Sequence, residues 1–258
     1  MRTRWRLVRK LPSALLALCI VQLWVATHAQ ESHPAHWSYE GMNGPENWAQ
    51  LDPAYATCAN GHAQSPIDIK RTNLADLPPL KFDYNSVPLS IINNGHTIQV
   101  NYASGSSLNV GEKTYALKQF HFHHPGEEYV SGRSFDFVAH LVHDDGSGQL
   151  AVVAILFKTG APNALLDAAW RNIPARAEQA TSVPLVSINA KDLLPPDHGY
   201  YTFRGSLTTP PCSEGVTWYV LKNQATLSTN QLAAFAKLYP SNARPIQPVY
   251  GREILETK

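Results

Sequence analysis

The chain has 258 residues, of which 44% are hydrophobic and 16% are charged, a balance typical of a globular protein with a sizeable core. Residues 1–29 hold five of the 21 Lys and Arg but none of the 20 Asp and Glu. The remaining chain therefore has 16 cations against 20 acids, a formal charge of about −4, and no basic run. These properties exclude nucleic acid as an expected partner.

The first segment has the order of basic, apolar and small residues that marks a secretory signal peptide. Its cations end at Lys10, an apolar run follows from Leu11 to Ala26, and residues 27–29 read Thr-His-Ala. The alternative is a membrane anchor, but a run of about 16 residues is shorter than the ~20 that a spanning helix needs. We expect cleavage after Ala29, a protein exported to the periplasm or secreted, and no stable membrane insertion.

Cleavage removes Cys19 and leaves two cysteines, Cys58 and Cys212. Two cysteines in an exported chain most often form a disulfide, and the alternative is a pair of unrelated buried thiols. A bridge between them would close a loop of about 154 residues. In the chain-entropy model such a bridge stabilises the fold by ~5 kcal/mol.

Residues 30–258 contain no repeat and no linker-like stretch, which predicts one domain. Short alternating segments between Gly-, Asn- and Asp-rich turns predict strands, and they lie at 89–102, 118–124, 134–143 and 150–158. Helical periodicity is sparse and predicts helices at 162–174 and 228–239, the second with Ser228 or Thr229 as N-cap. The expected fold is mainly β (α+β), with a large sheet and short surface helices.

Three histidines lie within four residues of the predicted strand QFHFHHP, residues 119–125. On a strand, His121 and His123 point to one face, about 6.5–7 Å apart at Cα, and His124 points to the other. If residues 118–124 and 135–143 pair antiparallel, His140 lies beside the first two histidines, whereas His143 faces away. Three imidazoles on one rigid face suit Zn²⁺ and leave a fourth coordination position open, as in catalytic zinc sites.

The alternative is a set of histidines on a solvated strand face. The alternation of Phe120 and Phe122, and of Phe135 and Phe137, indicates packed strands instead. Histidines on a packed strand need polar partners, which a shared metal supplies.

The segment GSLTTPPCSEGVTW, residues 205–218, adds a second chemical group. Two hydroxyls, at Thr208 and Thr209, precede two prolines and Cys212, which predicts a loop held in one conformation. A threonine beside a metal-bound hydroxide could orient that oxygen if its own proton has an acceptor, and Glu127 is a candidate. The alternative is an ordinary Pro-rich turn.

Together these residues resemble the α-class carbonic anhydrases in their bacterial exported form. The matching segments run in family order over residues 36–254: HWSYEG (36–41), QSPIDI (64–69), NNGH (93–96), QFHFH (119–123), AHLVH (139–143), LAVVAI (150–155), GSLTTPPC (205–212), VTW (216–218) and NARPIQP (242–248). The resemblance implies a zinc enzyme that hydrates carbon dioxide reversibly to bicarbonate and a proton, by attack of zinc hydroxide.

The resemblance also assigns site residues. The zinc ligands are His121, His123 and His140, and Thr208 orients the hydroxide while Glu127 accepts the hydroxyl proton of Thr208. The other roles are a proton shuttle at His96; a water network at Tyr39, Asn94 and Gln99; a substrate pocket at Val142, Val152, Leu207, Thr208, Thr209, Val216 and Trp218; partners of the ligand histidines at Gln119 and the backbone of Asn242; and a disulfide between Cys58 and Cys212.

The implied fold is a single domain with a mostly antiparallel twisted sheet of about ten strands and zinc at the floor of a conical cleft. We expect a monomer or a homodimer. The sequence departs from the family at Val138, where a glutamate usually contacts the third ligand histidine, and at Glu128, where many members have histidine or asparagine. Asp136 is nearby in sequence as a possible substitute for the missing glutamate.

Two other function classes are open to such a sequence. One is a non-catalytic relative of the carbonic anhydrases, although such relatives usually lose a ligand histidine. The other is a different zinc hydrolase, but neither His-Glu-x-x-His nor Gly-x-Ser-x-Gly occurs. Three neutral imidazoles also suit cobalt and iron(II).

Overall fold

Strands dominate the computed structural model, which describes Met1 and residues 35–258. The strands are β1 (Asp68–Ile69), β2 (Asn73–Ala75), β3 (Leu80–Asp83), β4 (Val87–Asn93), β5 (Ile98–Asn101), β6 (Ser107–Val110), β7 (Lys113–His123), β8 (Tyr129–Val130), β9 (Phe137–Asp144), β10 (Leu150–Thr159), β11 (Gln179–Ile188), β12 (Tyr200–Ser206), β13 (Glu214–Leu221), β14 (Ala225–Leu227) and β15 (Leu255–Thr257). The helices are short: α1 (Trp48–Leu51), α2 (Thr57–Asn60), α3 (Ala164–Trp170) and α4 (Thr229–Leu238). The predicted signal peptide, residues 1–29, lies outside residues 35–258.

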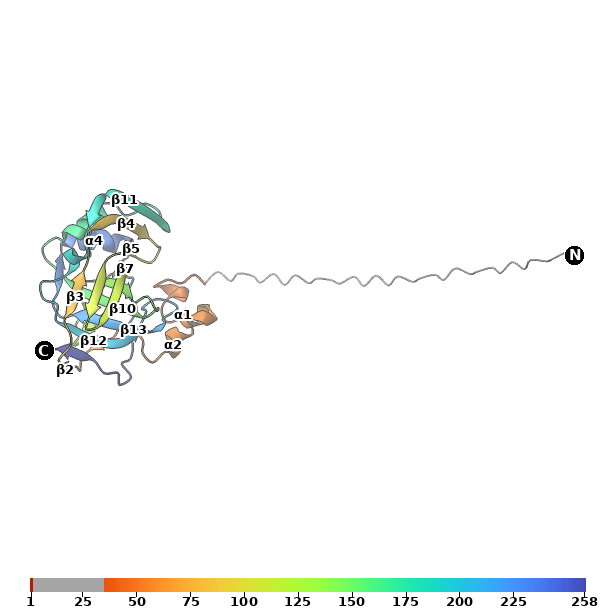
Figure 1. The fold of residues 1–258 in the computed structure, drawn as a ribbon, viewed down its shortest axis with the longest axis horizontal. Coiled ribbons are helices and arrows are strands. Elements are labelled where there is room, and N and C mark those ends of the chain that lie inside the picture. The colour runs from red at the N-terminus through yellow and green to blue at the C-terminus, as the bar shows by residue number, and fades with distance from the viewer. Residues whose placement is uncertain (2–34) are drawn as a thin grey trace. The chain divides into compact units, whose positions relative to one another are not determined.

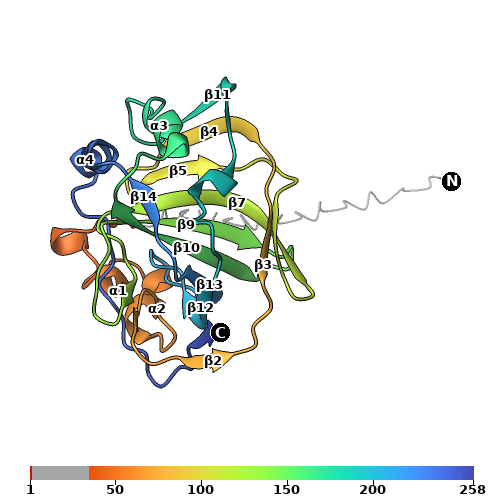
Figure 2. The same cartoon turned by 90° about the vertical axis from the view of Figure 1, so that its left-hand side faces the viewer.

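One large sheet holds 13 of these strands, in the order β11-β4-β5-β7-β9-β10-β13-β12-β15-β2, with β3, β6 and β14 attached beside this path. Figure 2 shows β4, β5, β7, β9 and β10 side by side, and Figure 1 shows β4, β5, β7 and β10 from another direction. The prediction of a mainly β fold with a large sheet is confirmed. The main path of the sheet has ten strands, in agreement with the about ten that the resemblance implies, and three more strands attach beside it.

The sheet is mixed, although most of its pairs are antiparallel. Strand β10 runs parallel to both β13 and β14, and β15 runs parallel to β2. Between β10 and β13 the chain passes through α3, β11 and β12, and a parallel pair requires such a long connection. The predicted turns could not reveal this pairing, because it joins segments that are far apart in the sequence.

The central strands are buried on both faces. On one face of β9, Phe137, Ala139 and Leu141 pack in the largest hydrophobic cluster, whereas Val138 on the other face packs in a second cluster with Ile67. Each fully buried Phe or Leu side chain stabilises the fold by about 1.5–3 kcal/mol. Histidines on these strands therefore lie on a rigid, well-packed support.

Both predicted helices are present and shorter than expected. Helix α4 begins with a capping box, in which the Ser228 side chain accepts from the Gln231 N–H and Gln231 Oε1 accepts from the Ser228 N–H. Ser228 is therefore the N-cap. Asn163 caps α3 by accepting from the N–H groups of Leu165 and Leu166. Among the described residues, no helix is long and apolar enough to cross a membrane.

Candidate metal centre

Strands β7 and β9 bring three histidines together. The predicted antiparallel pairing is confirmed, since His121 lies directly opposite His140 and His123 lies opposite Val138. One nitrogen from each of His121, His123 and His140 lies within 4.8 Å of the others. Alternation along the two strands places all three rings on the same face of the sheet.

The second nitrogen of each ring has a hydrogen-bond acceptor. His121 Nδ1 donates to Gln119 Oε1 at 2.9 Å, and His123 Nδ1 donates to the backbone oxygen of Asn242 at 2.7 Å. His140 Nε2 donates to Glu128 Oε1 at 2.8 Å. Because these acceptors fix which nitrogen carries the proton, the nitrogens that remain are Nε2 of His121, Nε2 of His123 and Nδ1 of His140.

The three remaining nitrogens fit a metal ion. His123 Nε2 and His140 Nδ1 are buried and have no hydrogen-bond partner in the part of the chain that the structure describes. Burial, followed by the nearby His140, lowers the pKa of His121 to about 3 and that of His123 well below its ordinary value, so both rings are neutral. Buried unpartnered nitrogens of neutral imidazoles are the donor set of a structural or catalytic zinc.

The environment of His140 differs from that of the other two rings. Burial lowers its pKa, but the carboxylates of Glu128 and Glu127 outweigh that effect and raise the pKa above the ordinary value. Sequence reasoning missed Glu128 as a partner of His140. The acid predicted as a possible substitute, Asp136, does not take this role, because its carboxylate accepts from the N–H and hydroxyl of Thr159.

Glu127 lies directly behind the histidines. Its Oε1 accepts from the backbone N–H of Arg244 at 2.7 Å, and its Oε2 lies 3.9 Å from His140 Nδ1. Burial raises the pKa of Glu127 to about 7, against the lowering effect of His140; Glu128 raises it further, and the Arg244 N–H and the Thr208 hydroxyl lower it. Thr208 is itself buried and lies close enough to Glu127 to affect its pKa, among other buried polar groups that include Glu128 and His140.

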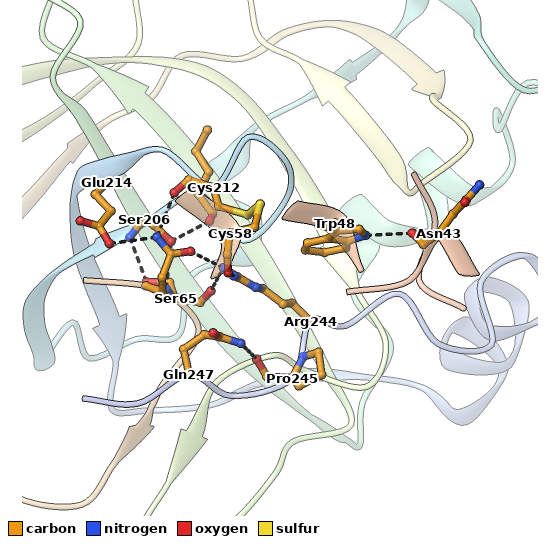
Figure 3. The surroundings of a disulfide bond; sticks show 12 residues. Asn43, Trp48, Cys58, Ser65, Ser206, Cys212, Glu214, Arg244, Pro245 and Gln247 are labelled. Carbon is orange, nitrogen blue, oxygen red and sulfur yellow. Dashed lines mark hydrogen bonds between the residues drawn. A yellow bond between two sulfur atoms is a disulfide. The ribbon is translucent and has the colours of Figure 1, made fainter. Parts of the chain in front are cut away.

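The loop that carries Thr208 is held at several points. Within it, Leu207 donates its N–H to the Ser213 carbonyl, and Cys212 donates its N–H to the Thr209 carbonyl. A disulfide joins Cys212 to Cys58, so the loop is tied to α2 (Figure 3). This loop therefore holds one conformation, as the prolines predicted.

Arg244 lies between the disulfide and Glu127, and sequence reasoning did not identify it. Its guanidinium is buried and donates to Gln64 Oε1, to the Ser65 carbonyl and to the Cys58 carbonyl, at 2.8 to 2.9 Å (Figure 3). Its backbone N–H holds Glu127. A buried arginine needs several acceptors, but a sequence does not show which ones it reaches.

His96 lines a cleft that His121 and His123 also line. Its ring stacks on Trp37, with ring centroids 3.7 Å apart and planes 7° from parallel. Burial, followed by the proximity of His36, lowers the pKa of His96, and Glu178 raises it in part. The cleft measures ≈ 120 Å³, whereas a cavity needs about 10–15 Å³ on the same measure to hold one water, so the cleft has room for several waters.

Polar residues form much of the cleft. Tyr39, Asn94, Gln99 and Thr209 all line it, as the resemblance implies. Asn94 has an additional structural role, because its Oδ1 accepts from the N–H groups of His96 and Thr97 and so shapes the turn that carries His96.

An apolar cluster packs beside His140. The Trp218 ring packs edge-on against the His140 ring, with centroids 4.9 Å apart. Val142 lies opposite Val152 on β10, and Val152 lies opposite Trp218 on β13. Val216 and Leu207 belong to the same cluster. The structure therefore brings together all the apolar residues assigned to the substrate pocket.

Two further histidines lie away from this group, in line with the predicted alternation. His124 Nδ1 donates to the Asp136 carbonyl at 2.9 Å. His143 is buried, and its Nε2 lies 2.7 Å from the Tyr84 hydroxyl. The Asn242 side chain was also missed: its Nδ2 donates to the carbonyls of His96 and Phe122, linking the turn of His96 to strand β7.

A mixed β-sheet on which three histidines converge from two neighbouring strands has the donor set of a three-histidine metal centre, the kind found in catalytic zinc proteins. Comparisons with known proteins identify the family. The sequence model described as eukaryotic-type carbonic anhydrase matches residues 43–258. The chain therefore belongs to the eukaryotic-type, or α, carbonic anhydrase family and is an enzyme of that family.

Individual relatives agree. A carbonic anhydrase of Pectobacterium carotovorum is 44% identical over 237 residues, which cover 91% of this chain and 96% of the relative. The solved α-carbonic anhydrase of Thermovibrio ammonificans, in complex with sulfanilamide, is 42% identical with a TM-score of 0.83, and the match covers 86% of this chain and 99% of that one. A hyperthermostable carbonic anhydrase from a hydrothermal vent chimney is 45% identical with a TM-score of 0.84, over 86% of this chain and 100% of that one.

Proposed function

We propose that the chain catalyses the reversible hydration of carbon dioxide to bicarbonate and a proton, with zinc held by His121, His123 and His140. The observation that carries the proposal is the convergence of three ring nitrogens, two of them buried and without a hydrogen-bond partner among the described residues. When bound, zinc acts as a Lewis acid that lowers the pKa of a coordinated water to about 7 and so makes a nucleophile available at neutral pH.

Thr208 and Glu127 orient the attacking oxygen. Glu127 has one oxygen engaged by the Arg244 N–H, and its Oε2 has no hydrogen-bond partner in the described part of the chain. A carboxylate accepts only, so in the proposed arrangement the Thr208 hydroxyl donates to the open Oε2 of Glu127 and keeps its own lone pairs for the nucleophile. That arrangement allows an incoming O–H to donate to Thr208 and aims the remaining lone pair at the substrate.

Carbon dioxide is apolar and rests against the apolar cluster of Val142, Val152, Leu207, Val216 and Trp218, beside His140. Weak binding there is sufficient, because the rate depends on what is bound more tightly in the transition state than in the ground state.

His96 relays the proton that each hydration releases. A group with a pKa near 7 that returns its proton to solvent unaided is limited to ~10³–10⁴ s⁻¹ by the diffusional ceiling of ~10¹⁰ M⁻¹s⁻¹. His96 shares the cleft with His121 and His123, and the polar side chains of Asn94 and Gln99 line the same cleft, which supports a relay through water. Its half-buried ring therefore faces both the site and the solvent.

The protein acts outside the cytoplasm, after cleavage of residues 1–29. The disulfide between Cys58 and Cys212 supports this location, because disulfides persist in oxidising compartments such as the periplasm.

Metal removal tests the proposal. We expect a chelator such as dipicolinate to abolish carbon dioxide hydration in wild-type protein and added zinc to restore it at one ion per chain. The His140→Ala variant should bind zinc far more weakly and stay inactive after zinc addition, whereas His124→Ala should respond like wild type. Restoration without zinc uptake would contradict the proposal.

A further inference from the structure

Glu128 is a buried carboxylate with a single hydrogen-bonded partner in the described chain. Its side chain is fully buried, and its Oε1 lies 2.8 Å from His140 Nε2. Its other oxygen, Oε2, is buried and has no hydrogen-bond partner among the described residues. A carboxylate in such a place is expensive to bury unless its charge is compensated nearby.

This acid does not come from the strand that carries His140. The resemblance leads us to expect a glutamate two residues before His140, but this chain has Val138 there. Val138 shares the strand face of His140 and packs with Ile67 and Ile69, so no acid reaches His140 from β9 itself. Glu128 instead enters from the segment between β7 and β8.

The geometry points to Glu128 as the residue that positions His140 as a zinc ligand. The acid that contacts His140 therefore comes from the loop that precedes β9, and not from β9 itself. This inference rests on the proposed zinc site. Because a carboxylate can only accept, the proton of His140 must lie on Nε2, which leaves Nδ1 for the metal. The negative charge also increases the electron density that His140 offers to a cation, as carboxylate partners of metal-bound histidines do.

The second carboxylate strengthens this argument. Glu127 Oε2 lies 3.9 Å from His140 Nδ1, so two adjacent acids flank one imidazole in a dry region. The Arg244 guanidinium, a buried cation that interacts with Glu127, is occupied by Gln64 and two backbone carbonyls. A divalent ion at the three histidines would compensate the remaining charge. Loss of Glu128 should therefore weaken zinc binding more than it weakens the apo fold.

Zinc retention provides the test, with the full-length mature protein. The half-time of zinc transfer to excess dipicolinate is measured for wild type, Glu128→Gln and Glu128→Ala, together with the urea midpoint of each apo protein. Glu128→Gln keeps an oxygen for His140 Nε2 but removes the charge, whereas Glu128→Ala removes both. We expect transfer about 10-fold faster in Glu128→Gln and up to about 100-fold faster in Glu128→Ala.

Two matched variants separate positioning from a general structural effect. Asp136→Asn changes an exposed acid of the same region that contacts Thr159 and not His140, and it should release zinc at the wild-type rate. The double change Glu128→His with Val138→Glu returns the acid to the usual family position. It should retain zinc within a few fold of wild type, whereas Glu128→His alone should release zinc as fast as Glu128→Ala.

The outcomes distinguish this inference from the proposed function. If wild type holds one zinc and both Glu128→Gln and Glu128→Ala release it at the wild-type rate, the inference is wrong and the zinc site stands. Failure of the double variant to improve on Glu128→His would also overturn the inference. If wild type takes up no zinc, the proposed function fails, and the inference with it. The visible spectrum of the cobalt-substituted protein, altered in Glu128→Ala and unchanged in Asp136→Asn, gives an independent readout of His140 placement.

Discussion

Removal of the disulfide should destabilise the protein by several kcal/mol. Cys58 and Cys212 are 154 residues apart, and closing a loop of this length in the unfolded chain reduces its entropy by about 17 cal/mol/K, or ~5 kcal/mol at 25 °C. The bridge also stands next to Arg244, whose guanidinium donates to the Cys58 carbonyl. Its loss therefore loosens α2 and the Thr208 loop together.

Urea denaturation of the double variant Cys58→Ala with Cys212→Ala measures this effect. With a slope of about 3 kcal/mol/M, a loss of ~5 kcal/mol lowers the midpoint by roughly 1.5 M. Wild type treated with a reductant is the matched control and should show the same midpoint as the double variant. If the free energy of unfolding falls by less than about 1 kcal/mol in both samples, the reasoning is refuted, because closing the long loop would then contribute little to stability.

Three further predictions concern the site and its surroundings. His96→Ala should keep its zinc, but its turnover should depend on buffer concentration: about 10-fold or more lower in weak buffer and restored by added imidazole. An equal loss of turnover at every buffer concentration would contradict a shuttle role. His124→Ala is the control. Thr208→Ala should lower kcat/KM for carbon dioxide about 10²-fold at unchanged zinc content, whereas Thr208→Ser should retain most activity. Equal rates in the two variants would count against a role of the Thr208 hydroxyl in orienting the nucleophile. Burial lowers the pKa of His143 to about 4, below its ordinary value of 6.5. Because the unfolded chain therefore binds the proton more tightly than the folded protein does, the contribution of His143 to the free energy of unfolding is full above pH 6.5. It falls by up to about 3 kcal/mol as the pH drops to 4. In urea titrations, His143→Gln should lose less stability over this pH window than wild type, and identical losses would show that His143 is not the source.

The convergence of His121, His123 and His140 could be predicted from the sequence because strand alternation is a local property. Once residues 118–124 and 135–143 are read as neighbouring strands, the spacing of His121 and His123 and the position of His140 follow from the period of two. The capping of α4 by Ser228 is local in the same way.

Features that depend on distant contacts could not be predicted. Glu128 reaches His140 from a loop, and no periodicity marks a loop residue that turns inward. Arg244 donates hydrogen bonds to Gln64 and Ser65, about 180 residues away in the sequence, and no local sequence pattern indicates these contacts. The side chain of Asn242 joins the turn of His96 to β7 for the same reason. Short strands such as β14 form because β10 offers an open edge, and their own three residues carry no signal.

The most direct test of the zinc carbonic anhydrase assignment is stopped-flow hydration of carbon dioxide by the mature protein, with zinc content determined on the same sample. We predict fast hydration with about one zinc per chain, abolished by an aromatic sulfonamide. One zinc per chain without hydration would contradict the catalytic assignment, and a chain that holds no zinc would contradict the assignment of His121, His123 and His140 as its ligands.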